Sequence, residues 1–311
     1  MRVASIDIGT NAVLLLIADI DDNGAIKPVE HRQRFPRLGK EVDNKYIISP
    51  SAFETVANVL NEYKNLSQKY EVGNIVACAT SAVRDSSNKN EFVNHLKDAT
   101  GIHVEVISGE DEALITYKGA ISGLTKQSKR IVVLDIGGGS TEFSFRRDND
   151  FVTHSLQIGA VRLTERYFKH NTPTNEEIQL TNAAILSEFL RVGVIDFSSY
   201  IFVGVAGTVT TLACLDQNLI EFDVNRVSGY KLTYECVDGW SNKFISMTSL
   251  QIRSLSNTTE GRADILPAGV LILLNFMKHF NFKEILVSER GLRYGMAFRE
   301  WEKQNKLMGG D

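Results

Sequence analysis

The sequence predicts an α/β protein made of two domains of the same design, and three observations lead to this prediction. The chain has 311 residues, of which 43% are hydrophobic and 23% charged, an ordinary globular composition at a length typical of about two domains. Each half begins with three β-rich runs and continues with helices and strands. The stretch "SIDIGTNAVLLLIADI" near the start is echoed by "VLDIGGGSTEFSF" in the second half, which favours a duplicated domain.

The first half contains a clear hairpin followed by helices and strands. Arg2–Ile8 and Val13–Ile20 are β-rich and are joined by a Gly-Thr-Asn turn. A Ser-Pro start and regularly spaced apolar residues predict a helix from Ser49 to Leu66. The other expected elements are an extended run at Ile26–Arg34, strands at Asn74–Ala79 and His103–Ile107, and helices at Lys89–Ala99 and Gly109–Ile121. The predicted order is βββαβαβα.

The second half repeats this order. The expected extended runs are Arg130–Ile136, Thr141–Arg147 and Phe151–Leu156, followed by helices at Ala160–Phe168 and Asn175–Val192 and a strand at Tyr200–Val205. A further helix is expected from Thr208, then a strand at Glu284–Ser288 and a final helix from Gly291 to about Lys306. We expect the two domains to face each other across a cleft, with a glycine turn from each pointing inward.

Charge and cysteine usage exclude several classes of protein. The net charge of −4 argues against a protein that binds nucleic acid through overall positive charge. Cys78, Cys214 and Cys236 are odd in number and far apart, so neither a disulfide framework nor a zinc site is expected. The uncharged run Ala12–Ala18 is too short to cross a membrane. We therefore expect a cytoplasmic protein with no nucleic-acid or membrane partner.

The run "VVLDIGGGSTEFSF", Val132–Phe145, places three glycines directly after an apolar strand. The chain has no GxxxxGK[ST] segment and no GxGxxG between a strand and a helix, so neither a P-loop nor a Rossmann site is supported. A second strand follows the glycines, which places them on a hairpin turn. Successive backbone N–H groups in such a turn form a nest that binds anions. The sequence therefore predicts a phosphate-binding turn.

Seven segments, taken in order, resemble the exopolyphosphatase/guanosine pentaphosphate phosphatase (Ppx/GppA) family: "IDIGTN", "ATSAVRD", "VISGEDEA", "VLDIGGGSTE", "GVAGTVTTLA", "ADILPAG" and "SERGLRYG". The resemblance covers nearly the whole chain. It implies duplicated ribonuclease-H-like domains of the actin/Hsp70/sugar-kinase superfamily, with mixed sheets flanked by helices and a cleft between them. It also implies a short two-domain form, with one domain at 1–124 plus a C-terminal helix at 292–311 and the other at 125–291.

Glu112 is the expected catalytic residue. Ser108 is a plausible helix N-cap, which places Glu112 in the first helical turn, where the helix dipole favours an ionised carboxylate. Such a group can act as a base or orient an attacking water. The matching glutamate is the catalytic residue of the family that the chain resembles. The alternative is that Glu112 only stabilises its own helix.

Two further acids, Asp135 and Glu142, flank the glycine turn on adjoining strands. Their hard oxygen ligands suit a magnesium ion that bridges to phosphate. The resemblance assigns these two residues to metal or water binding, with Mg²⁺ or another divalent cation as the cofactor. It assigns Asp7 to the facing phosphate loop. The alternative for Asp7 is a hydrogen bond to its own turn.

The remaining predicted site residues bind phosphate. The guanidinium of Arg84 offers a bidentate fork for phosphate oxygens, and the family uses an arginine here. The other expected phosphate ligands are Gly9, Thr10, Asn11, Gly137, Gly138, Gly139, Ser140, Thr141, Gly207 and Thr208. Helix–strand packing explains Gly207 about as well. In the first loop the family usually continues with Ser and often has Arg two residues later, where this chain has Ala12 and Leu14.

These features favour an enzyme that hydrolyses the terminal phosphoanhydride bond of inorganic polyphosphate and releases phosphate. Hydrolysis of guanosine pentaphosphate (pppGpp) at its 5′ end is the alternative within the class. Three alternatives lie outside the class of phosphoanhydride hydrolases: an ATP-dependent kinase on the same fold, a catalytically weak polyphosphate or nucleotide sensor, and an actin-like filament protein. The sequence leaves a homodimer, the metal's identity and the preferred chain length open.

Overall fold

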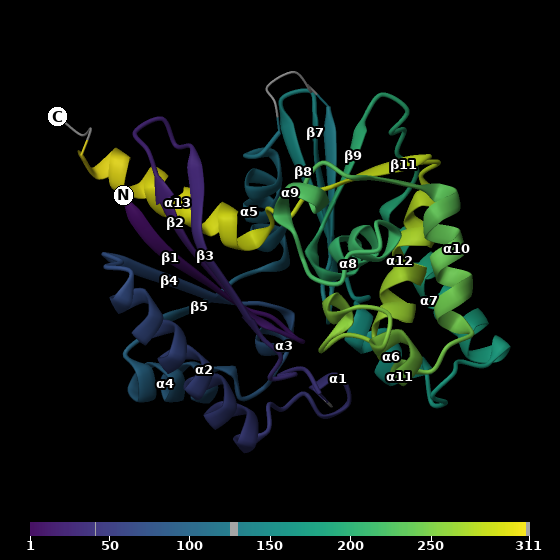
Figure 1. Ribbon diagram of the computed structural model, residues 1–311, viewed down its shortest axis with the longest axis horizontal. Coiled ribbons are helices and arrows are strands. Elements are labelled where there is room, and N and C mark those ends of the chain that lie inside the picture. Colours follow the sequence, from purple (N-terminus) through teal and green to yellow (C-terminus); the bar gives the residue numbers. More distant parts are fainter. Residues whose placement is uncertain (41, 125–129, 309–311) are drawn as a thin grey trace. The chain divides into compact units, whose positions relative to one another are not determined.

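The computed structural model describes residues 1–40, 42–124 and 130–308 (Figure 1). The chain forms two compact units, Met1–Leu124 with Arg290–Asp311 (unit 1) and Thr125–Glu289 (unit 2). The predicted start of the second domain, at 125, and the predicted end of the last helix, at 311, lie outside the described residues. Each unit has its own sheet and its own hydrophobic core.

Unit 1 contains a five-stranded mixed sheet in the order β3-β2-β1-β4-β5. Strand β2 is antiparallel to β1 and β3, whereas β4 is parallel to β1 and β5. The strands are β1 (Arg2–Ile8), β2 (Val13–Ile20), β3 (Ile26–Arg34), β4 (Asn74–Ala79) and β5 (Val104–Val106). The helices are α1 (Val42–Lys45), α2 (Pro50–Lys69), α3 (Ser81–Arg84), α4 (Lys89–Thr100), α5 (Gly109–Ile121) and α13 (Leu292–Met308).

The two faces of the unit 1 sheet are covered by different helices, with α2 and α4 on one side and α5 and α13 on the other (Figure 1). Successive side chains of a strand point to opposite faces. Accordingly Ile6 packs into the core with α2 and α4, whereas Val3 packs against α13. Ser5 is on the Val3 side and donates a hydrogen bond to the carbonyl of Arg293. The same alternation places Asp7 on the face covered by α5 and α13.

Unit 2 contains a six-stranded mixed sheet in the order β10-β11-β9-β6-β7-β8. The strands are β6 (Ile131–Ile136), β7 (Thr141–Arg147), β8 (Asp150–Leu156), β9 (Ile201–Val205), β10 (Lys231–Thr233) and β11 (Glu284–Val287). The helices are α6 (Ala160–Tyr167), α7 (Asn175–Val192), α8 (Ala206–Asp216), α9 (Val224–Val227), α10 (Tyr234–Ile245), α11 (Ser249–Arg253) and α12 (Leu266–His279), with a short 3₁₀ helix at Asn257–Thr259.

The order β8-β7-β6-β9-β11 repeats the order of unit 1, and β10 is an added edge strand. Helices α6, α7, α10 and α12 lie together on one side of the sheet (Figure 1). Their shared core is rich in phenylalanine, including Phe143, Phe189 and Phe276. The predicted duplicated, ribonuclease-H-like α/β fold, with mixed sheets flanked by helices, is confirmed.

Several elements differ from the sequence prediction. Helix α8 begins at Ala206, two residues before the expected Thr208. The one-turn helix α3, which ends at Arg84 just past strand β4, was not predicted. The sequence pattern predicted no helix or strand between the helix that became α8 and the strand that became β11. The structure has strand β10 and helices α9 to α12 in this region. In the parts of the chain that the structure describes, no helix combines the length and the apolar character needed to cross a bilayer.

Candidate phosphate-binding and catalytic sites

The glycine turns of the two units have the same geometry. In each unit the antiparallel strands pair up to the last residue before a four-residue turn. The N–H of Gly9 donates to the carbonyl of Ala12 at 2.9 Å, and that of Gly137 donates to Ser140 at 3.0 Å. A Cβ atom would lie 3.1 Å from the Ala12 oxygen at Gly9 and 2.9 Å from the Ser140 oxygen at Gly137. Any side chain at Gly137 would force the backbone to shift, and one at Gly9 would make a tight contact. Both predicted hairpins are present.

The turn of unit 2 is held by the N-terminus of α6. The N–H of Ala160 donates to the carbonyl of Gly137 at 2.9 Å, and the N–H of Val161 donates to Gly138 at 2.8 Å. Gly159, just before α6, has no room for a side chain, because a Cβ atom would lie 2.4 Å from the Gly138 oxygen. The backbone carbonyls of the turn are thus used to fix it within its own unit.

The turn of unit 1 is held by the segment that follows β3. The N–H of Gly39 donates to the carbonyl of Thr10 at 2.8 Å, and the N–H of Arg37 donates to Asn11 at 3.1 Å. The hydroxyl of Thr10 is buried and lies 2.9 Å from the hydroxyl of Ser81. The Thr10 side chain therefore has a structural contact. Its role as a phosphate ligand stays a prediction.

Glu112 and Arg84 form a buried ion pair in unit 1. Helix α5 begins as expected, with the Ser108 hydroxyl accepting from the N–H of Asp111 at 3.0 Å. Arg84 Nη1 lies 2.9 Å from Glu112 Oε2. Burial nevertheless raises the pKa of Glu112, and the Arg84 charge only partly opposes this rise. Desolvation of the carboxylate thus outweighs the favourable charges around it, so the net shift of the pKa is opposite in direction to the one that the helix dipole alone favours.

Asp7 is a second acid with a raised pKa in unit 1. Burial raises its pKa to about 7, the Glu112 charge adds to the rise and Arg293 opposes it. Its Oδ1 atom is buried and accepts no hydrogen bond from any described residue. The alternative that Asp7 only accepts a hydrogen bond from its own turn is therefore not supported at Oδ1.

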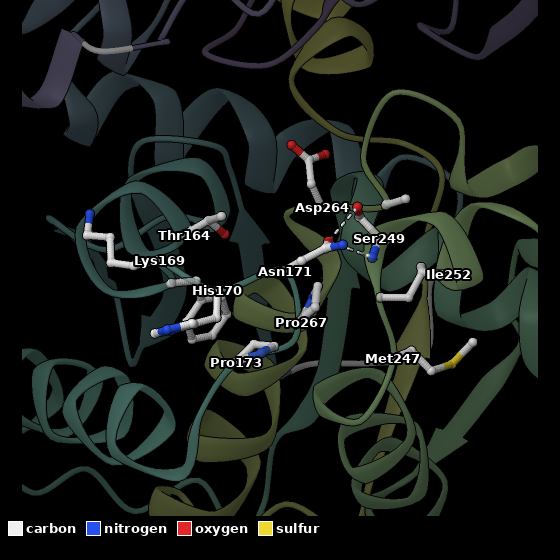
Figure 2. A pocket seen from close by; sticks show the side chains of 12 residues that line it. Thr164, Lys169, His170, Asn171, Pro173, Met247, Ser249, Ile252, Asp264 and Pro267 are labelled. Carbon is white, nitrogen blue, oxygen red and sulfur yellow. Dashed lines mark hydrogen bonds between the residues drawn. The ribbon is translucent and has the colours of Figure 1, made fainter.

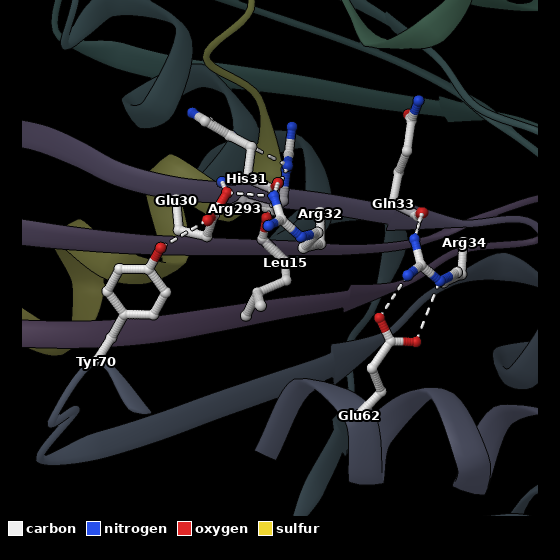
Figure 3. Close-up of polar contacts among 9 residues, drawn as sticks. All are labelled: Leu15, Glu30, His31, Arg32, Gln33, Arg34, Glu62, Tyr70 and Arg293. Carbon is white, nitrogen blue, oxygen red and sulfur yellow. Dashed lines mark hydrogen bonds and ion pairs between the residues drawn. The ribbon is translucent and has the colours of Figure 1, made fainter. Parts of the chain in front are cut away.

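Arg293, at the start of α13, is a residue near Asp7 that the sequence analysis did not assign to the site. Its Nη1 donates to the carbonyl of Leu15 at 3.1 Å and lies 3.5 Å from His31 Nδ1 (Figure 3). Burial and the Arg293 charge lower the pKa of His31 to about 4, so this imidazole is neutral at pH 7. The signal was the presence of Arg293 in "SERGLRYG", one of the segments that carries the family resemblance.

The arginines farther along β3 have acidic partners. Arg32 pairs with Glu30, and Arg34 Nε and Nη2 donate to both carboxylate oxygens of Glu62 (Figure 3). Glu30 also accepts from the hydroxyl of Tyr70 at 2.8 Å. The charges of Arg32 and Arg34 are therefore both paired with carboxylates of unit 1.

Asp135 and Glu142 are opposite each other in the β6–β7 register, so both side chains project from the same face of the sheet. Glu142 is buried, and its Oε1 accepts a hydrogen bond from the Ser155 hydroxyl at 2.8 Å. Two like charges at directly opposite positions are unfavourable unless a cation offsets them. Within the described ranges no cluster of three or more potential ligands forms a metal site. Two carboxylates do fit Mg²⁺, which usually takes one or two carboxylates, several waters and a substrate phosphate.

The hydroxyl of Thr141 lies next to this pair in sequence. Thr141 is fully buried, and its Oγ1 has no hydrogen-bond partner in the described part of the chain. A buried hydroxyl without a partner is unusual and is commonly satisfied by a ligand or an ordered water. This observation is consistent with the predicted role of Thr141 in binding phosphate.

The turn between β9 and α8 is tightly packed. Ala206 has a positive φ of 68°, an uncommon conformation for a residue with a side chain. A Cβ atom at Gly207 would lie 2.0 Å from Arg262 Nη1, and one at Gly269 would lie 2.4 Å from Thr208 Oγ1. Packing is thus sufficient to explain Gly207, and Thr208 directs its hydroxyl at α12. Phosphate binding by these two residues stays a prediction.

Unit 2 also contains a pocket of about 240 Å³ between the end of α6, α11 and the start of α12 (Figure 2). None of the predicted site residues lines it. Several of its polar groups bond to one another or to neighbours: Asn171 Oδ1 accepts from the N–H and the hydroxyl of Ser249, and His170 pairs with Glu177. We therefore assign no ligand to this pocket.

Comparison with known proteins gives a consistent result. The sequence model of the Ppx/GppA phosphatase family matches residues 16–304. Exopolyphosphatase 2 of Mycobacterium tuberculosis is 32% identical over 316 residues, which cover 95% of this chain and 97% of that protein. A Fusobacterium nucleatum protein named bifunctional 3-dehydroquinate synthase/phosphatase is 35% identical over 298 residues. The match covers 92% of this chain but only 44% of that protein.

Solved structures agree with these sequence matches. The crystal structure of the Aquifex aeolicus member of the Ppx/GppA family has a TM-score of 0.82 at 35% identity, and the match covers 98% of this chain and 99% of that one. The family match extends over most of the chain, and both units contribute segments to it. The chain belongs to the Ppx/GppA phosphatase family.

Proposed function

We propose that this protein is an exopolyphosphatase, which hydrolyses the terminal phosphoanhydride bond of inorganic polyphosphate and releases phosphate. The observation that carries the proposal is the buried pair of Glu112 and Arg84, with its atoms 2.9 Å apart and the pKa of Glu112 raised. A carboxylate whose pKa is moved toward neutrality is a better base than an ordinary one. The name exopolyphosphatase on a relative of nearly equal length supports this substrate.

In the proposed reaction Glu112 accepts a proton from a water molecule. The oxygen of that water attacks the terminal phosphorus, and the anhydride P–O bond breaks on the opposite side. The bonding electrons leave with the shortened polyphosphate, and the terminal group departs as inorganic phosphate. Arg84 neutralises charge on the phosphate oxygens through its guanidinium, which also keeps the Glu112 carboxylate oriented. The reaction needs no covalent intermediate with the protein.

The turn of unit 2 binds phosphate oxygens in this proposal. Its contributions are the backbone N–H groups of Gly138 and Gly139 and the buried hydroxyl of Thr141. Asp135 and Glu142 would hold Mg²⁺. When bound, this ion would offset negative charge on the phosphate.

Guanosine pentaphosphate is the second candidate substrate, because its 5′ end presents the same terminal phosphoanhydride. All the residues assigned above are proposed to contact phosphate groups, and none is proposed to contact a nucleobase. The family name also covers phosphatases of this nucleotide. The two substrates are therefore compared in the same experiment.

The test is phosphate release from long-chain polyphosphate and from guanosine pentaphosphate, with Mg²⁺ present. Glu112→Gln keeps the shape of the side chain but cannot accept the proton, and we expect a loss of roughly 10²- to 10⁴-fold. Glu110→Gln is the matched control, because Glu110 lies in the same helical turn but is exposed. Equal slow activity in the wild type and Glu112→Gln would contradict the proposal and favour a sensor. Faster release from the nucleotide would favour the second substrate.

A further inference from the structure

The side chain of Arg162 contacts the glycine turn of unit 2. Arg162 is in the first turn of α6 and is only 9% exposed. Its Nε lies 2.5 Å from the carbonyl oxygen of Gly139. A buried guanidinium is costly unless it is hydrogen-bonded, and this carbonyl provides one acceptor. The contact joins residues that are 23 positions apart in the sequence.

With this contact, three successive carbonyls of the turn are bound by α6. Those of Gly137 and Gly138 accept from the backbone N–H groups of Ala160 and Val161, and that of Gly139 accepts from the Arg162 side chain. In a planar trans peptide the C=O and the N–H of the same unit point in opposite directions. The N–H groups of the next three residues, Gly138, Gly139 and Ser140, are therefore directed away from α6.

These directed N–H groups have the arrangement of an anion nest. Those of Gly138 and Gly139 donate no hydrogen bond to any residue in the described part of the chain. The first turn holds the corresponding carbonyl differently: Asn11 has the position of Gly139 there, and its oxygen accepts from the backbone N–H of Arg37. Both units thus fix the third carbonyl of the turn, but in unit 2 a side chain does so.

We propose that Arg162 is a positioning residue, which locks the Gly139–Ser140 peptide so that the Ser140 N–H binds a phosphate oxygen. This inference rests on the proposed phosphate-binding role of the turn. Without the Nε–H donor the peptide is free to rotate, and its N–H no longer points in a fixed direction. The phosphate then loses one hydrogen bond to a charged acceptor.

The most informative variant is Arg162→Lys. Lysine has nearly the same length and keeps the positive charge, but it places a methylene where Arg162 has Nε–H. Arg166→Lys is the matched control, because Arg166 lies one turn farther along α6 and is exposed. The probe is inorganic phosphate, titrated against the full chain while the backbone amide NMR signals are recorded. Urea unfolding of each variant checks that the fold is kept.

In the wild type, phosphate should shift the amide signals of Gly138, Gly139 and Ser140. In Arg162→Lys the Ser140 shift should be lost and the phosphate Kd should rise about tenfold, as expected for one lost hydrogen bond to a charged group. Arg166→Lys should behave like the wild type. Should Arg162→Lys not fold, Arg162→Met takes its place with the same expectation.

Two results would overturn the inference. In the first, Arg162→Lys binds phosphate with the same Kd as the wild type. In the second, phosphate does not shift the amide signals of Gly138, Gly139 and Ser140 in the wild type. Failure of the proposed function is a separate outcome. In that case phosphate still shifts the turn amides in an Arg162-dependent way, but polyphosphate is not hydrolysed.

Discussion

Replacing Arg84 with Met removes the cation that hydrogen-bonds the buried Glu112 carboxylate. The two charged groups lie 2.9 Å apart, and their side chains are 18% and 9% exposed. Removing one partner from so buried a pair costs about 3–5 kcal/mol, because the other charge is left without compensation. Glu112 can avoid part of this cost by taking up a proton, so the effect must depend on pH.

The direction of this dependence follows from the pKa of Glu112. Burial already raises this pKa, and removing Arg84 raises it further, because the charge and the hydrogen bond of Arg84 are what lower it. The folded state then holds a proton that the unfolded state has released. Such a group stabilises the fold at low pH, and this contribution is lost as the pH rises through the raised value. The stability that Arg84→Met loses should therefore be smaller at low pH and larger at high pH.

Urea unfolding of four proteins measures this effect: the wild type, Arg84→Met, Glu112→Gln and the double variant, each at about pH 5 and about pH 8.5. Because the double variant contains no buried charge at the pair, it should recover most of the stability that Arg84→Met loses at the higher pH. An equal loss at both pH values, together with additive effects of the two substitutions, would show that Arg84 does not compensate a buried charge on Glu112.

Three further predictions concern the glycine turns and Asp7. Burial raises the pKa of Asp7 to about 7, so the free energy of unfolding of the wild type should fall as the pH rises toward and through 7. In urea unfolding, Asp7→Asn should lose this part of the pH dependence. An unchanged pH profile in the variant would contradict the raised pKa of Asp7. Gly137→Ala places a methyl group 2.9 Å from the Ser140 oxygen and should slow phosphate release about tenfold, whereas Gly239→Ala, whose Cβ meets nothing within 4 Å, should not. Leu14→Arg places a cation opposite Asp7 in the β1–β2 register and should lower the KM for polyphosphate; an unchanged KM would show that this cation does not reach the substrate.

The hairpins could be predicted from sequence because their signals are local. An apolar run, a glycine turn and a second β-rich run lie within about fifteen residues, and the close contact at Gly137 depends only on residue Ser140 of the same turn. Helix α12 was missed for the opposite reason. It is buried on nearly all sides, so its sequence "LPAGVLILLNFM" has no polar face and no helical period to detect.

The sequence proposes candidate site residues one by one, but it does not show how they are arranged. Arg84 and Glu112 were each assigned a role, yet the sequence pattern does not show the hydrogen bond between them, because it joins two residues 28 positions apart, one in α3 and one in α5. The pKa of Glu112 was predicted in the wrong direction, since burial is a property of the packed unit and not of the helix that contains the residue. For the same reason the sequence pattern assigned no specific role to Arg162 or Arg293, whose contacts depend on the packing of α6 and α13.

The central step of the proposed reaction is attack by water at the terminal phosphorus, with Glu112 as the base. The most direct test is a single-turnover reaction of polyphosphate in ¹⁸O-labelled water, with mass analysis of the products of the wild type and Glu112→Gln. The released inorganic phosphate should carry one ¹⁸O atom and the shortened chain none, and the label should appear much more slowly in the variant. Label in the shortened chain, or a rate that does not depend on Glu112, would contradict this mechanism.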